Sequence, residues 1–425
     1  MIFKRLLEFT KYVISLLLIL SSNSFSDDFY SKALKDAAIT NGFKKPSEIN
    51  SSFDKEKSKL GKEFFHEKIL SFNTKNTCSS CHLPRFSSAD GLPNAVGGLA
   101  TGIGIKRLMS KGAKVVPRNT LPLWGRGGKN FNTFFWDGKV MMDGDKIISQ
   151  LGLLEQNYAT STGLYSIDVK DNALLTAVHL PFVELRELVE DDEEIHKELK
   201  NESIGTAFDI YSDIAKRVKD NPYYSKKIME LYNVELGEIT FHNVADAITH
   251  FIRDEFAIKE TPFSNFVFNN KKLPKKTVKG GLIFYGKGKC ASCHSGEFFS
   301  DFDFHSIPFP QIGFGKNGFG VDYGRFNITF DPEDLYKFRT PPLYNVERSF
   351  PYSHSGSVYS LRKAVIYHFD PLRDFKANDF SEIDRNEYYK KLAASGESID
   401  SIPYLDSEEI SSLVDFLKTL TFIKK

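Results

Sequence analysis

The sequence predicts a mainly α-helical chain made of two similar domains, and three observations lead to this prediction. The first is a short pattern that occurs twice, as Cys78-Ser-Ser-Cys81-His82 and as Cys290-Ala-Ser-Cys293-His294. The second is that apolar residues with helical spacing precede each pattern, and a long loop with aromatic residues follows it. The third is the length of 425 residues, for which two to three domains are usual.

Each repeat has the form C-x-x-C-H, the attachment signal for a c-type haem. The two thiols add across the haem vinyl groups, and the adjacent histidine, His82 or His294, becomes the proximal ligand of the iron. The two patterns use all four cysteines of the chain, so none remains for a disulfide framework. The sequence therefore predicts two covalently bound haem c groups, one in each of two cytochrome c-like domains.

Paired cysteines also occur in two other kinds of site. Two C-x-x-C pairs together supply the four thiolates of a zinc site, and one pair is typical of a thioredoxin-like dithiol. Neither site requires a histidine directly after the second cysteine. Histidine accounts for only 10 of the 425 residues, so finding it after both pairs favours haem attachment.

The N-terminus, residues 1–26, has the three parts of a secretory signal peptide. Basic residues come first, an apolar run follows at 12–20, and residues 21–26 are mostly serine. The run is short for a transmembrane helix, so we expect cleavage near Ser26, with an uncleaved membrane anchor as the alternative. Export to the periplasm agrees with the haem motifs, because bacteria attach c-type haem outside the cytoplasm. The formal net charge of +1 gives no indication of nucleic-acid binding.

The first domain is expected to span residues 27–270. Residues 83–118 are rich in Gly, Pro and Ser and are expected to form a loop over the open face of the first haem. Residues 140–172 have an irregular pattern. The apolar spacing predicts helices at 60–71, at 172–190 with an interruption at Pro181, and at 204–219, 223–232 and 241–256.

The second domain, residues 271–425, repeats this order in a shorter form. Its boundary is placed near residue 270, in a stretch that contains Pro and Lys, and a helix beginning at Thr277 leads into the second motif. A capping box at or near Ser407 starts an amphipathic C-terminal helix that runs to Leu420. A helix in this position is usual at the end of cytochrome c folds.

Beyond the motifs, the chain resembles the bacterial di-haem cytochrome c peroxidase and MauG family from about Leu60 to Leu420. The resemblance is carried by the terminal helix and by Leu60-Gly-Lys-Glu-Phe-Phe, Arg118-Asn-Thr, Phe135-Trp-Asp-Gly-Lys139, Phe338-Arg-Thr-Pro-Pro-Leu-Tyr-Asn345, Pro351-Tyr-Ser-His-Ser-Gly356 and Ser360-Leu-Arg-Lys-Ala-Val365. It implies that the first haem reacts with peroxide and that the second passes electrons. Many members rest with a histidine of the following loop on the first iron. Residues 83–118 contain no histidine, so this iron is expected to stay open, as in MauG-like members.

The resemblance also implies a second ligand for the second haem. In the family this residue stands seven positions after the Leu of a Ser/Thr-Leu-x-x-Ala/Val-Val pattern, and it is Met in classical peroxidases and Tyr in MauG. Counting from Leu361 gives His368, and Tyr367 is the alternative. Two imidazole ligands should give a lower reduction potential than His and Met together.

Two further positions match residues that the family uses in catalysis. Trp136 matches a tryptophan that lies between the two haems. The alternative is that Trp136 is simply a large residue of the hydrophobic core. Cleavage of the O–O bond needs a group that takes a proton from one peroxide oxygen and returns it to the other. Glu187, followed by Leu188, is the best match for that acid, and Glu184 is the second. The glutamine that accompanies the acid in the family has no counterpart here.

Asn119, Ser349 and Pro351 fall where the family supplies oxygen atoms to a Ca²⁺ between the domains, and such ligands suit this ion. His354 matches a histidine near the haem propionates and this ion, where a polar linking role is expected.

Three functions are compatible with these features. The first is a periplasmic peroxidase that reduces hydrogen peroxide with electrons from a small cytochrome c or cupredoxin. The second is a MauG-like enzyme that uses peroxide to oxidise Trp or Tyr side chains of a partner protein. The third is a non-catalytic di-haem electron-transfer protein, which would have two six-coordinate irons. Classical relatives often form homodimers, and no residue of this sequence tests that state.

Overall fold

A computed structural model describes residues 28–72, 74–149, 173–189, 204–315, 320–396 and 402–422, together with residues 195, 197 and 199. The expected signal peptide and residues 150–172 lie outside the described residues. In the described ranges, no helix combines the length and the apolar character needed to span a bilayer. The chain is mainly helical, which confirms the predicted class.

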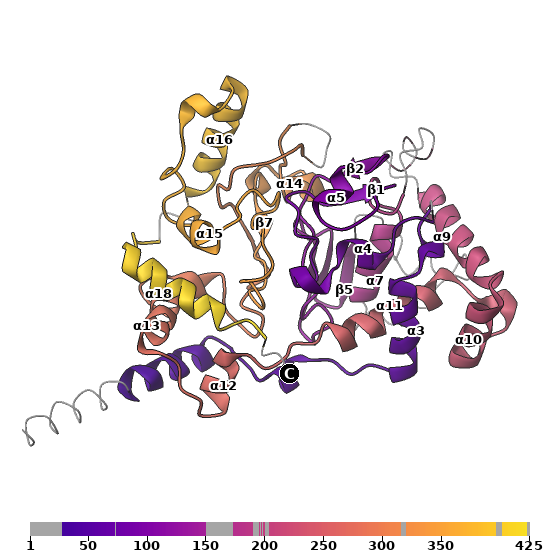
Figure 1. Cartoon of the computed structure of the whole chain (residues 1–425), viewed down its shortest axis with the longest axis horizontal. Coiled ribbons are helices and arrows are strands. Elements are labelled where there is room, and N and C mark those ends of the chain that lie inside the picture. Colours follow the sequence, from indigo (N-terminus) through magenta and orange to yellow (C-terminus); the bar gives the residue numbers. More distant parts are fainter. Residues whose placement is uncertain are drawn as a thin grey trace, which may run out of the picture.

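The elements fall into two groups that lie side by side (Figure 1). The longer helices of the first group are α3 (Lys55–Phe65), α7 (Ala173–His179), α9 (Ile204–Lys219), α10 (Pro222–Tyr232) and α11 (Phe241–Glu255). Those of the second are α12 (Pro262–Phe268), α13 (Lys275–Tyr285), α15 (Leu361–Tyr367), α16 (Glu382–Ala394) and α18 (Ser407–Lys418). Four single-turn helices are α2 (Pro46–Ile49), α4 (Cys78–Cys81), α5 (Ile105–Leu108) and α14 (Phe326–Thr329).

The strands are short and form three small antiparallel sheets. They pair β1 (Val96–Gly98) with β2 (Ala113–Val115), β3 (Thr133–Phe134) with β4 (Val140–Asp143), β4 with β5 (Lys146–Ser149), and β6 (Phe304–His305) with β7 (Phe338–Arg339). The β4–β5 hairpin corrects the expectation that residues 140–149 are irregular. Its apolar residues Met141, Met142, Ile147 and Ile148 pair across the two strands and favour an extended backbone.

Each group is built on a pair of helices that cross at a glycine. In the first group α3 packs on α11, and a Cβ atom at Gly61 would collide with the carbonyl oxygen of Ala247. In the second, α13 packs on α18, and a Cβ atom at Gly280 would collide with the carbonyl oxygen of Ser412. Each haem motif follows the first helix of its pair, so both motifs start from the same local framework.

The described N-terminal segment packs against the second group. The helix at residues 28–40 places Leu34 against Gly281 of α13, and the amide of Gly296 donates to the carbonyl of Asn41 at 2.8 Å. The ring of Phe43 contacts Phe263 of α12, with 4.9 Å between the centroids. The domain boundary near residue 270 stays a prediction. The contacts just described join residues before this boundary to residues after it.

Helix ends follow local capping. The helix expected at 60–71 begins at Lys55 instead, because the Asp54 side chain accepts hydrogen bonds from the amides of Glu56 and Lys57. It ends at Phe65. The C-terminal capping box is formed by Asp406 and Glu409, one residue before the expected Ser407. The predicted helix at 204–219 is confirmed, and α10 and α11 begin or end within one residue of prediction.

Replacing Gly280 with alanine should destabilise the protein by about 1–3 kcal/mol, since the added methyl group would force α13 away from α18. The better helix propensity of alanine, about 1 kcal/mol, acts in the opposite direction and is smaller than the cost of such a collision. Denaturant unfolding followed by far-ultraviolet circular dichroism measures the change. Gly237→Ala is the matched control, because nothing lies within 4 Å of its added Cβ atom. Equal midpoints for the two variants would contradict the proposed crossing.

Candidate active site

The first motif forms a single helical turn that presents its histidine beside two thiols. Helix α4 spans the two cysteines, and His82 is its C-terminal cap. The Nδ1 atom of His82 lies 2.8 Å from the carbonyl oxygen of Ser88, so Nδ1 carries the proton and Nε2 remains for a metal. Burial lowers the pKa of His82 to about 4, which keeps the imidazole in the neutral form that binds iron.

The second motif repeats this arrangement. The Nδ1 atom of His294 lies 3.0 Å from the carbonyl oxygen of Phe299. His368, at the C-terminal end of α15, has its own Nδ1 2.8 Å from the carbonyl oxygen of Ala364. The two rings face each other with 6.3 Å between their centroids. A metal bound by both Nε2 atoms at a usual distance of about 2.0 Å would place the ring centres roughly 6 Å apart, so the pair fits one iron between them.

His82 has a different neighbour. Among the described residues, the ring next to His82 is that of Phe65, with 6.2 Å between the centroids, and not a second imidazole. The loop over residues 83–118 contains one methionine, Met109, and this residue is 82% exposed. Strand β1 of this loop passes beside the motif, since the Cys81 thiol lies 3.8 Å from the Val96 carbonyl oxygen. The two motifs are therefore unequal in what stands opposite the histidine.

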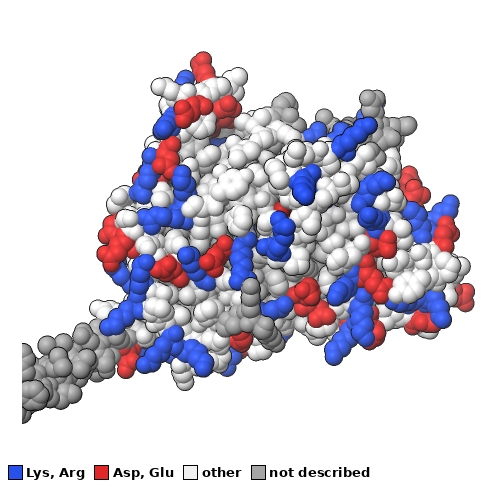
Figure 2. Space-filling view, in the orientation of Figure 1, with Lys and Arg blue, Asp and Glu red and all other residues white. Residues whose placement is uncertain are grey.

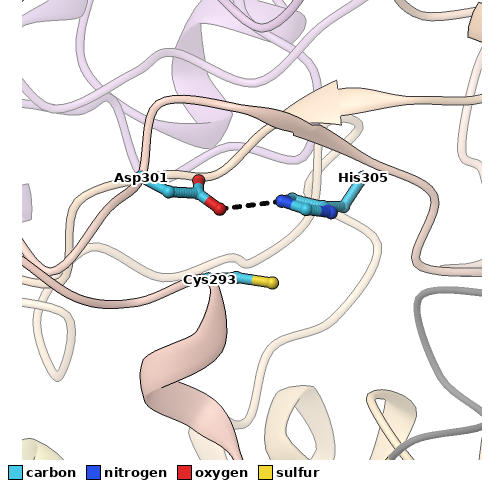
Figure 3. Close-up of side chains that lie close together, drawn as sticks. All are labelled: Cys293, Asp301 and His305. Atoms are coloured by element: carbon cyan, nitrogen blue, oxygen red, sulfur yellow. Dashed lines mark hydrogen bonds and ion pairs between the residues drawn. The ribbon is translucent and has the colours of Figure 1, made fainter.

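The cysteine pairs do not come together in one zinc site. Among the described residues, the one cluster with three potential ligand atoms consists of Cys293, Asp301 and His305 (Figure 3). Asp301 and His305 form an ion pair at 2.9 Å, which raises the pKa of His305 to about 10 with help from Cys293. When Cys293 is bound to haem as a thioether, this cluster lacks its thiolate and the ion pair remains.

Trp136 lies where the two groups meet. Its Nε1 donates to the carbonyl of Asn119 at 3.0 Å, and its own carbonyl accepts from the amide of Arg339 at 2.8 Å. Arg339 also donates to the carbonyl of Phe135, and Arg325 donates to the carbonyl of Asp137. The segment that carries the indole is thus held by side chains from the second half of the chain.

A buried charge network next to Trp136 was not predicted from the sequence. Arg118 donates to Asp137 at 2.5 Å and, through two nitrogens, to Asp322 at 2.6 and 2.9 Å. Both carboxylates are fully buried. Burial disfavours the charged Arg118, but the two carboxylates outweigh it and raise its pKa, whereas the pKa of Asp322 falls to about 2. The Arg118-Asn-Thr stretch pointed to this region, but no pattern marked Asp322.

The two candidate acids lie in and beside a turn that contacts strand β1. The Gly98 amide donates to the Glu187 carbonyl at 3.2 Å, and Glu184 forms an ion pair with the buried Lys139. Burial opposes the charge of Lys139, but Glu184 and then Glu187 raise its pKa. The pKa of Cys81 rises to about 12 through burial, with a smaller effect from the charge of Glu187. Glu187 therefore lies near both the first motif and Lys139.

The residues implied in calcium binding are partly brought together. The Asn119 amide donates to the Pro351 carbonyl at 2.6 Å, and the Asn119 Oδ1 atom is buried without a hydrogen-bond partner among the described residues. The Ser349 hydroxyl instead faces the carbonyl of Val346 at 3.4 Å. The ring of His354 stacks on Phe338, with 4.0 Å between the centroids, and its Nε2 atom has no hydrogen-bond partner in the part of the chain that the structure describes. A buried oxygen without a partner fits a hard cation at this point.

Comparisons with known proteins show the family to which the chain belongs. The family model described as di-haem cytochrome c peroxidase matches residues 55–272, which is half of the chain. The MauG protein of Methylorubrum extorquens is 25% identical over 342 residues, covering 78% of this chain and 75% of MauG. Cytochrome c551 peroxidase of Pseudomonas aeruginosa is 23% identical over 310 residues, covering 72% of this chain and 69% of the peroxidase.

Solved structures show the same fold. A MauG-like protein associated with microbial copper homeostasis superposes with a TM-score of 0.61 at 21% identity, covering 90% of this chain and 93% of that one. The di-haem peroxidase BthA of Burkholderia thailandensis superposes with a TM-score of 0.59 at 17% identity, covering 90% of this chain and 89% of BthA. The chain therefore belongs to the di-haem cytochrome c peroxidase family of oxidoreductases that act on peroxide.

Proposed function

We propose that this protein is a periplasmic di-haem peroxidase with two cytochrome c-like domains, in which the haem at His82 meets hydrogen peroxide and the haem at His294 relays electrons. When bound, the two haems supply the iron-centred electron transfer that peroxide reduction needs. The observation that carries the proposal is the inequality of the motifs. The ring centroids of His368 and His294 lie 6.3 Å apart, whereas the ring next to His82 in the described part of the chain is that of Phe65.

The chain's own residues supply the other requirements of the reaction. The carbonyls of Ser88 and Phe299 orient the two proximal imidazoles. Glu187 would take a proton from one peroxide oxygen and return it to the other, which is the task of a general acid–base. Trp136 would connect the two centres, because its segment is bonded to residues of both halves.

A MauG-like activity towards a partner protein is the second candidate. Two observations favour it: the loop at 83–118 lacks a histidine, and the residue opposite His294 is not methionine. The partner or electron donor would meet the surface of the protein. Charges of both signs are interspersed towards the edges of the face in Figure 2, and its middle is mainly uncharged with a few basic side chains. A small cytochrome c, a cupredoxin and a substrate protein are the candidate partners, and a homodimer stays a prediction.

Electron paramagnetic resonance of the ferric protein tests the proposal. We expect one high-spin and one low-spin haem, and two low-spin haems would leave only the non-catalytic electron-transfer function. Addition of peroxide then separates the two enzymes. Rapid turnover with a reduced small cytochrome supports the peroxidase, and a long-lived spectral change without a donor supports oxidation of a partner protein.

A bound Ca²⁺ between the halves is a further part of the proposal, with Asn119 Oδ1 and the carbonyls of Ser349 and Pro351 as ligands. Calcium at 100 times its dissociation constant should stabilise the fold by about 2.7 kcal/mol relative to the chelated protein. Thermal unfolding with and without chelator measures this difference. Asn119→Ala should abolish the calcium response, whereas Asn269→Ala, at the end of α12, should retain it. An unchanged response in Asn119→Ala would rule out this ligand.

A further inference from the structure

None of the three buried arginines, Arg107, Arg126 and Arg339, forms an ion pair with a described carboxylate. Arg126 is 7% exposed and Arg339 is fully buried, and neither forms an ion pair with any described residue. Arg126 donates through Nε to the carbonyl of Pro122 at 2.8 Å. Arg339 donates to the carbonyls of Phe135 and Thr340, and its Nη2 atom has no hydrogen-bond partner among the described residues.

The charge of Arg118, in the same region, is compensated by the protein itself. It is bonded to two buried carboxylates, Asp137 and Asp322. Arg107 also lacks a carboxylate, but its Nε and Nη2 atoms both donate to the Val96 carbonyl, and Nη2 donates to the Asn76 side chain as well. A guanidinium ion taken out of water without a counter-ion costs several kcal/mol. In agreement, burial lowers the pKa of Arg126 to about 10. Arg126 and Arg339 differ from Arg107 because their Nη2 atoms have no hydrogen-bond partner among the described residues, so these two arginines call for an anion.

Each of the two arginines is connected to one of the proximal histidines. The segment that carries Arg126 is fixed by the amide of Leu123, which donates to the Ser88 hydroxyl at 2.8 Å, and the Ser88 carbonyl is the partner of His82. The residue after Arg339 is Thr340, whose carbonyl accepts from the Ser300 hydroxyl at 2.7 Å. Ser300 directly follows Phe299, whose carbonyl is the partner of His294.

The two guanidinium groups also share one neighbour. Their central carbons lie 5.4 and 5.7 Å from the centroid of the Phe131 ring. Phe131 stands five residues before Trp136, and Arg339 is bonded directly to the Trp136 segment. The unpaired positive charge is thus concentrated between the two motifs.

We propose that Arg126 and Arg339 are carboxylate-binding residues that each pair with a propionate of the adjacent haem, Arg126 at the haem of His82 and Arg339 at the haem of His294. A haem carries two propionates, so it brings into the protein the anionic groups that these arginines lack. The inference rests on the proposed function, since it requires both haems. A fixed cation beside a haem favours the reduced form, so the two arginines would raise the reduction potentials of the two centres.

Spectroelectrochemical titration of the holoprotein tests the pairing, with the two haems distinguished by their spin states. Arg339→Gln should shift the reduction equilibrium of the low-spin haem about tenfold towards the oxidised form, which is about 59 mV. Arg126→Gln should do the same to the high-spin haem. Arg126→Lys and Arg339→Lys keep the charge and should stay closer to the unmodified protein. Arg85→Gln removes an exposed arginine from the first haem loop and is expected to change neither potential.

Two further measurements keep the outcomes distinct. The pyridine haemochromogen spectrum counts covalent haem, and fewer than two haems per chain in the unmodified protein would refute the proposed function itself. If a Gln variant does not fold, the Lys variants are examined by resonance Raman, in which the propionate-bending band should move because a compact ammonium group replaces the planar guanidinium. Two haems with unchanged potentials in the Gln variants, or an unmoved band in the Lys variants, would overturn the pairing.

Discussion

Replacing His368 with alanine should convert the second haem completely from low spin to high spin. The imidazole of His368 is positioned for one ligand role only, because its Nδ1 is bonded to the Ala364 carbonyl and its ring faces His294 at 6.3 Å. Loss of this donor would leave a five-coordinate or water-bound iron and raise its reduction potential. Electron paramagnetic resonance and the visible spectrum of the ferric protein measure the change.

Tyr367→Phe is the matched control for this ligand. Tyr367 is the neighbouring residue on α15 and was the alternative ligand, but its ring contacts Phe309, with 5.6 Å between the centroids. The variant should keep the low-spin signal of the unmodified protein. If the low-spin haem survives in His368→Ala and is lost in Tyr367→Phe, the ligand is the tyrosine.

Replacing Glu187 with glutamine should lower peroxide turnover by about 10²–10⁴-fold, the range usual for loss of a general acid–base. The amide keeps the shape of the side chain but does not shuttle a proton. The haem spectra of the resting protein should not change, since Glu187 is not an iron ligand in this proposal. Steady-state oxidation of a reduced small cytochrome by peroxide measures the loss.

Glu184→Gln separates the two candidate acids. The carboxylate of Glu184 is held in an ion pair with Lys139, so it is already engaged by a protein side chain. Its replacement should lower turnover by less than the loss of about 10²–10⁴-fold expected for the general acid–base. A larger loss in Glu184→Gln than in Glu187→Gln would reverse the assignment.

Much of the framework was predictable because its causes are local. Helices α9, α10 and α11 follow apolar spacing in continuous stretches, and the terminal helix follows a capping box. The errors also have local causes. Asp54 starts α3 five residues earlier than the apolar spacing suggested. The crossing glycines Gly61 and Gly280 lie in stretches that the sequence marked as helical, but their partners on α11 and α18 were not visible there.

The sequence by itself determined the chemistry of attachment. Two thiols and a histidine within five residues are enough to specify a covalent haem site, because one porphyrin spans that distance. It also predicts that the two sites differ, because residues 83–118 contain no histidine.

Only the tertiary structure decided what surrounds those sites. His368 was reached by counting within a family pattern, and the fold shows it facing His294. Arg118 pairs with Asp322, which lies more than 200 residues away in the sequence. Arg126 and Arg339 are just as far apart in the sequence, and they have no such partner among the described residues. Charge compensation in a buried region is a property of all groups that converge there. For that reason no local pattern predicts it, and the second half of the chain had to be placed against the first.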